Sequence, residues 1–145
     1  MSQDTDWKVN IKTLEKQRLT LMVLKDGEVL FRSDKPGLMP VVDLLETNMD
    51  NLVGTTVVAR TVGIALAKLL LWQHVQRIDA VRVTRRAQAL LSRSGIKLNC
   101  ARLTEELIES ETGQPDRYEA MCIKHDHPEL FYQALREELL IFKPT

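Results

Sequence analysis

The pattern of apolar and polar positions predicts a β-hairpin near the start of the chain. Residues 19–25 and 28–32 are rich in apolar and β-branched side chains, and Asp26-Gly27 joins them. A type I′ turn needs positive φ at both central residues, which Asp-Gly adopts readily. We therefore predict two antiparallel strands here.

Helical spacing of apolar residues appears on both sides of this hairpin. Asp6 is a suitable N-cap for a short N-terminal helix, with residues 1–13 as a peripheral element. Pro40 suits the first turn of a second helix. Near the other end, Asp126 and Glu129 form a variant of the capping box, which predicts a final helix.

Strands and helices alternate through the middle of the chain. The pattern predicts, in order, a strand over 55–60, a buried helix over 63–74, a strand over 78–83, a helix over 85–94 and a strand over 97–103. Gly95 suits the end of the second of these helices, and Thr104 opens a short acidic helix. Such alternation requires crossovers and hence parallel pairing. We predict one α/β domain over 1–145, with a mixed sheet in three α/β/α layers.

Composition places the chain among globular domains. Of its 145 residues, 44% are hydrophobic and 28% are charged, which does not fit a disordered chain. The longest apolar stretch, 64–72, contains Lys68 and is far shorter than the roughly 20 residues of a membrane span. The polar start, MSQDTDWK, has no signal-peptide pattern, and two cysteines give no disulfide framework. We expect a cytoplasmic protein without a membrane anchor.

The charges are unevenly distributed although they cancel, with 20 basic and 20 acidic residues. Residues 77–102 hold seven basic residues and one acidic residue, whereas residues 103–145 hold four basic and ten acidic ones. This layout fits an anion-binding region, two surfaces that meet within the fold or across a homodimer, or two solvated faces of opposite sign. Nucleic-acid binding as the main role is disfavoured, because aromatics are 5% and no binding motif is present.

Two turns that follow predicted parallel strands could bind an anion. Thr84, Arg85 and Arg86 open a helix, so its first N–H groups and two guanidinium groups can converge. Thr61 and Gly63 stand at the equivalent place after the preceding strand. Ligands of open α/β sheets bind at this edge, which predicts a site for an anionic small molecule or nucleotide. In the alternative interpretation, Arg85 and Arg86 pair with the acidic C-terminal segment.

A metal site is disfavoured. Cys122, His125 and His127 form a C-x-x-H-x-H pattern, but on a strand the cysteine would face away from both histidines. The favoured interpretation is that the two histidines cap helices or lie on the surface. Cys100 is expected to be a small, buried hydrophobic residue. We expect no metal and no cofactor.

Several segments, taken in order, resemble a known family. They are Val23–Phe31, Gly37–Leu45, Gly54–Ala67, Ala87–Leu91 with Gly95-Ile96, and Asp126–Leu135. Together they are similar to an uncharacterised bacterial family, domain of unknown function 1893, placed in the cytidine-deaminase-like superfamily. The resemblance implies a cytidine-deaminase-like fold. Glu119 agrees with the family pattern, whereas Ala59, Ile64 and Asp116 depart from it.

Zinc deaminases use H-x-E or C-x-E at one helix start and P-C-x-x-C at the next. Here the corresponding starts read Gly37-Leu-Met-Pro and Thr61-Val-Gly-Ile-Ala, without these residues. We therefore predict a deaminase-like domain without deaminase catalysis, which binds a small molecule or serves regulation. The alternatives are a homo-oligomeric interaction module without a ligand, or an enzyme of different chemistry that uses residues such as Arg85 and Glu119.

Overall fold

The computed structural model describes residues 6–48, 52–105 and 116–141. The elements are, in chain order, α1 (Asp6–Lys16), β1 (Leu21–Lys25), β2 (Glu28–Ser33), α2 (Met39–Asn48), β3 (Thr56–Val62), α3 (Ile64–Trp72), β4 (Arg77–Thr84), α4 (Arg85–Ser92), β5 (Lys97–Thr104), α5 (Arg117–Lys124) and α6 (Pro128–Ile141). Within these ranges, every strand belongs to one five-stranded sheet.

The sheet is mixed, as predicted. Its strand order is β2-β1-β3-β4-β5. The hairpin strands β1 and β2 are antiparallel, β1 also pairs antiparallel with β3, and β3, β4 and β5 run parallel. The predicted turn is confirmed by φ values of 51° at Asp26 and 82° at Gly27. Parallel pairing of the last three strands confirms the crossovers inferred from the alternating pattern.

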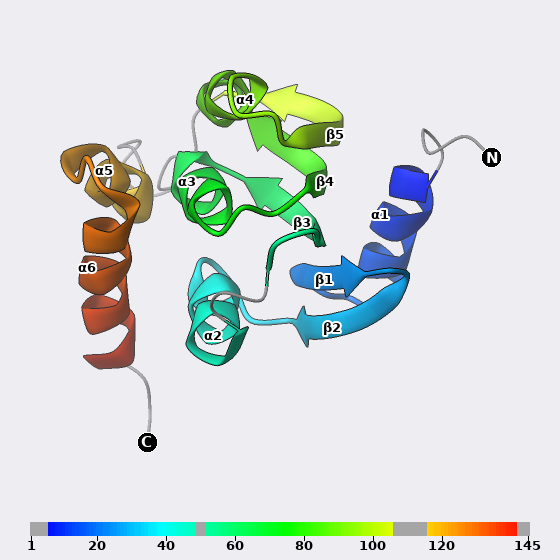
Figure 1. The fold of residues 1–145 in the computed structure, drawn as a ribbon, viewed down its shortest axis with the longest axis horizontal. Coiled ribbons are helices and arrows are strands. Elements are labelled where there is room, and N and C mark those ends of the chain that lie inside the picture. The colour runs from blue at the N-terminus through cyan, green and yellow to red at the C-terminus, as the bar shows by residue number, and fades with distance from the viewer. Residues whose placement is uncertain (1–5, 49–51, 106–115, 142–145) are drawn as a thin grey trace.

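Helices cover both faces of the sheet, as Figure 1 shows. Helix α1 lies on one face, while α2, α3 and α4 lie on the other. The connections through α3 and α4 step in the same direction across the sheet, so right-handed crossovers place both helices on one face. Helices α5 and α6 pack against the outer side of this helical layer. The predicted three layers are thus extended by an outer pair of helices.

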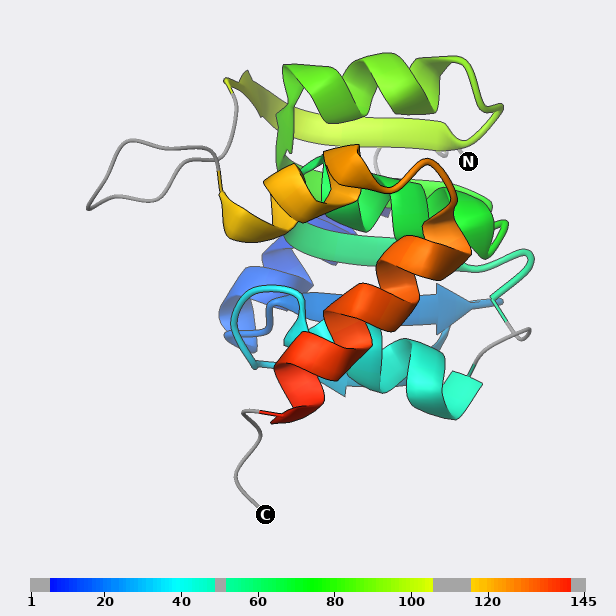
Figure 2. The same ribbon diagram turned by 90° about the vertical axis from the view of Figure 1, so that its left-hand side faces the viewer.

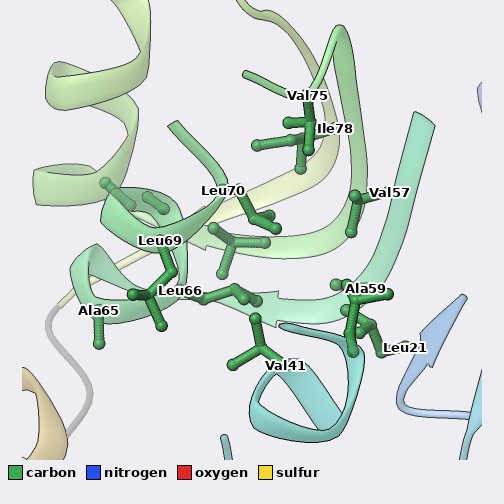
Figure 3. Close-up of a cluster of buried hydrophobic side chains, with 14 of the residues drawn as sticks. Leu21, Val41, Val57, Ala59, Ala65, Leu66, Leu69, Leu70, Val75 and Ile78 are labelled. Atoms are coloured by element: carbon green, nitrogen blue, oxygen red, sulfur yellow. The ribbon is translucent and has the colours of Figure 1, made fainter. Parts of the chain in front are cut away.

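The larger core lies between the sheet and α2, α3 and α4. Figure 3 shows Leu66 and Leu70 of α3 between that helix and the strands, with Leu66 next to Val41 of α2. Helix α3 is apolar around most of its circumference because α5 and α6 cover the side that faces away from the sheet. In the ranges that the structure describes, no helix is long and apolar enough to cross a membrane.

The structure differs from the predictions in the second half of the chain. Thr104 is the last residue of β5 rather than the start of a helix, because its backbone continues the pairing with β4. The acidic helix predicted to follow falls on 106–115, outside the described residues. Helix α5 was not predicted, although Asp116 caps it by accepting hydrogen bonds from the N–H groups of Tyr118 and Glu119.

Candidate small-molecule pocket

A pocket of about 350 Å³ lies at the carboxyl end of β3. Its walls are formed by the loop that leads into α2, the junction of β3 with α3 and the first turn of α5, together with the start of β1 and Arg82 of β4. Figure 2 shows the start of α5 and the loop before α2 at the same end of the sheet. This volume and this position at the carboxyl ends of parallel strands are typical of small-molecule sites in α/β proteins.

Most of the pocket wall is apolar. Leu21 comes from β1, Leu38 and Val41 from the start of α2, and Leu66 from α3. Gly37, with φ of +64°, lets the chain turn into α2 at the pocket edge. This wall suits the apolar body of a ligand.

Two of the residues that line the pocket are arginines, Arg60 and Arg82. The Arg60 Nε donates a 2.6 Å hydrogen bond to the carbonyl oxygen of Leu19. The Arg82 Nη2 donates a 2.9 Å hydrogen bond to Oγ1 of Thr61. A guanidinium group has five N–H donors, so each arginine keeps donors for a ligand after making its protein contact.

The most buried charged residue of the pocket is Glu119 on α5. Its Oε1 accepts a 2.9 Å hydrogen bond from the N–H of Ile64, and its Oε2 accepts one of 2.7 Å from Ala65. These N–H groups open α3, where Gly63 has no side chain to cap them. The Glu119 carboxylate therefore caps α3 and fastens α5 to it.

Burial raises the pKa of the Glu119 carboxyl group above its usual value. The hydrogen bonds from Ala65 and Ile64 act in the opposite direction because they stabilise the carboxylate. The negative charge of Asp116 raises the pKa further, and the positive charge of Arg86 lowers it. Desolvation is the largest of these effects.

The structure separates the two turns that the sequence predicted to act together. Thr61 and Gly63 line the pocket, whereas Thr84, Arg85 and Arg86 are not in its lining. Thr84 is buried and caps α4, its Oγ1 accepting a 3.1 Å hydrogen bond from the N–H of Ala87.

The two arginines after Thr84 lie near acidic groups. Arg85 forms an exposed ion pair with Glu105, with 2.8 Å between Nε and Oε1. Arg86 lies close enough to Glu119 to lower its pKa. Both contacts agree with the alternative interpretation, in which these arginines pair with the acidic segment.

Arg60 and Arg82 were not predicted as site residues from the sequence. No simple period-2 pattern marks Arg82, because its neighbour Val83 belongs to the same core as Ala80. The contact of Arg82 with Thr61 depends on the register between β3 and β4, which a single sequence does not reveal.

The cysteine and histidines of the C-x-x-H-x-H pattern lie around the junction of α5 and α6. Cys122 is buried with its Sγ 3.9 Å from the carbonyl oxygen of Ile64, and burial raises its pKa to about 11. His125 caps the end of α5, and the carbonyl of His127 accepts a hydrogen bond from Phe131 in α6. In ranges 6–48, 52–105 and 116–141, no group of three or more His, Cys, Asp or Glu residues could hold a metal ion.

Comparison with known proteins identifies the family. The model of a family described as TM1506, domain of unknown function (DUF1893), matches residues 9–139. The crystal structure of a DUF1893 family protein, TM1506 from Thermotoga maritima, is similar, with 25% sequence identity and a TM-score of 0.80. The similarity covers 95% of this chain and 92% of that chain. A comparison with curated proteins finds no match. The chain therefore belongs to the DUF1893 family.

Proposed function

We propose that this protein binds a small molecule with an apolar body and an anionic group, such as a nucleotide, in the pocket at the end of β3. The observation that carries the proposal is the combination of an apolar cavity of about 350 Å³ with Arg60 and Arg82 in its lining. The apolar wall would bury the body of the ligand, and a guanidinium group matches carboxylate or phosphate oxygens in a bidentate way.

The two acidic residues of the lining are already engaged with helix ends. Asp116 accepts hydrogen bonds at the start of α5, and Glu119 does so at the start of α3. Helix N-termini stabilise negative charge, so both carboxylates are partly balanced. Arg60 and Arg82 are thus left to attract a ligand anion.

We also propose that the fold is cytidine-deaminase-like without the deaminase reaction. The starts of α2 and α3 border the pocket, as Gly37 and Gly63 in its lining indicate. Neither start has the histidine, cysteines or glutamate that hold zinc and move protons in deaminases. The Glu119 carboxylate binds the first N–H groups of α3 instead. Binding, with a regulatory role for the bound state, is the function that this site supports best.

Nucleotide titration of matched arginine variants tests the binding proposal. Nucleoside monophosphates would be titrated calorimetrically into the wild type, Arg82→Gln and Arg93→Gln. Arg93 is an exposed arginine just after α4 and outside the pocket lining. A charge-assisted hydrogen bond contributes about 1.5–3 kcal/mol, so Arg82→Gln should weaken binding about tenfold or more. Arg93→Gln should bind as the wild type does.

Two results would contradict the binding proposal. In the first, no nucleotide binds to the wild type or raises its melting temperature. In the second, Arg82→Gln and Arg93→Gln change the affinity by the same factor, which would indicate a general effect of charge.

A second candidate function is a homodimeric interaction module, which we propose because β2 ends the sheet with exposed apolar side chains. Val29 and Leu30 on β2 are 45% and 46% exposed. An edge strand offers unpaired backbone groups to another chain. Such a dimer is compatible with ligand binding, because neither residue lines the pocket.

A further inference from the structure

Arg82 and Arg102 are direct neighbours on adjacent parallel strands. The register pairs Thr61 of β3 with Arg82 of β4, and Arg82 with Arg102 of β5. Adjacent strands lie about 4.8 Å apart, and residues paired in this way point to the same face. Two guanidinium groups are thus attached side by side at the carboxyl end of the sheet.

The rows of residues before and after these arginines contribute to the core. Ala59, Ala80 and Cys100 are paired across the same three strands, two residues earlier in each. All three belong to the core beneath α3 and α4 or pack against it. Val62 and Val83, paired with each other one residue after Thr61 and Arg82, belong to the same core, whereas Arg82 and Arg102 are exposed.

Neither guanidinium is balanced by a carboxylate in the parts of the chain that the structure describes. The hydrogen bond of Arg82 goes to the neutral hydroxyl of Thr61, and Arg102 makes no ion pair in 6–48, 52–105 or 116–141. Glu105, close to Arg102 in the chain, pairs with Arg85 instead. Like charges directly opposite each other on neighbouring strands repel, and an anion bound between them removes that repulsion.

We propose that the natural ligand carries two linked anionic groups, as a diphosphate does, and this inference rests on the proposed function. Arg82 would bind one anionic group and Arg102 the next. Arg82 lines the pocket and Arg102 does not. A ligand with a single anionic group needs only Arg82, whereas a second group would extend out of the pocket along the row toward Arg102. Each guanidinium can bind its group through two N–H donors.

Paired ligands that differ in one phosphate test this inference. We would titrate three ligand pairs into the wild type, Arg102→Gln and Arg93→Gln. The pairs are AMP with ADP, the mono- and diphosphates of the other common nucleosides, and phosphate with pyrophosphate. Both substituted arginines are exposed, and melting temperatures would confirm that the variants fold. We expect diphosphates to bind about tenfold or more tightly than monophosphates, as charge-assisted bonds allow. Arg102→Gln should remove this advantage and change monophosphate binding less than about twofold, while Arg93→Gln should change neither.

The outcomes separate the two proposals. Monophosphates that bind through Arg82, with diphosphates binding no more tightly, would overturn the two-anion inference and leave the proposed function intact. The inference also fails where Arg102→Gln weakens both ligand classes equally or affects neither. A wild type that binds none of these anions would overturn the proposed function and the inference with it.

Discussion

Glu119 on α5 accepts a 2.7 Å hydrogen bond from the backbone N–H of Ala65 on α3, across 54 positions of the chain. The same carboxylate also accepts a hydrogen bond from Ile64, so one side chain satisfies two N–H groups of a helix start. This contact holds one pocket wall in place, and its chemistry gives the first prediction.

The stability of the wild type relative to Glu119→Gln should fall as the pH rises. Burial raises the pKa of Glu119 in the folded state above its ordinary value of 4.5. Protonation therefore favours the folded state, and its contribution is complete below about pH 4.5 and lost as the pH rises through the raised pKa. Urea unfolding of both proteins between about pH 4 and pH 8 measures the difference. An increase with pH would show that the hydrogen bonds and Arg86 outweigh burial.

Asp79 is expected to be the most costly carboxylate to remove. It is fully buried on β4, and its oxygens accept hydrogen bonds from Arg77 at 2.7 Å and from Asn10 and Asn99 at 3.0 Å. Asp79→Ala leaves the Arg77 guanidinium, 15% exposed, without its partner, which should cost about 3–5 kcal/mol of unfolding free energy.

Lys35→Ala provides the control for Asp79. It breaks the more exposed ion pair with Asp43 and should cost about 1 kcal/mol or less. Denaturant titration of both variants gives the two values, and equal costs would show that the Asp79 network contributes no more than a surface pair.

The protein purified without chelators should contain far less than one zinc ion per chain, and it should not deaminate cytidine. The reason is the residue types at the starts of α2 and α3, which lack the ligands and the proton-transfer glutamate of zinc deaminases. Elemental analysis and an assay for ammonia release measure these properties. Zinc at about one per chain would contradict the prediction, and Cys122→Ala would then test whether the C-x-x-H-x-H pattern holds it.

Self-association at low salt is predicted from the opposite charges of the two chain segments and from the edge strand β2. A lysine on an edge strand prevents pairing with another strand, so Leu30→Lys should shift a dimer to the monomer. Leu130→Lys is the matched control, because Leu130 is similarly exposed, at 49%, but lies on α6. Sedimentation velocity distinguishes the states. A wild type that stays monomeric at all practical concentrations would contradict the prediction.

The features that the sequence predicted correctly depend on local chemistry. Asp26-Gly27 determines the hairpin because few residue pairs adopt two positive φ values. Thr84 caps α4 through a hydrogen bond to a residue only three positions later. Parallel pairing of β3, β4 and β5 followed from the short strand–helix–strand spacing, which leaves room for one crossover helix per connection.

The features that the sequence did not predict depend on contacts between distant segments. Helix α5 has only eight residues, and short helices gain most of their stability from tertiary packing. Its anchor is the contact of Glu119 with α3, which no local pattern indicates. The row that contains Arg82 and Arg102 likewise exists only because the strand register aligns residues 20 positions apart.

Helices α5 and α6 pack mainly on α2 and α3, and the N-cap and first turn of α5 supply Asp116, Tyr118 and Glu119 to one side of the pocket. The backbone pairing of the sheet therefore does not constrain that side. Substitutions at the start of α5 can therefore reshape that side of the pocket while the strands below remain the same. Arg60 and Arg82, in contrast, belong to β3 and β4, where the sheet pairing fixes the backbone.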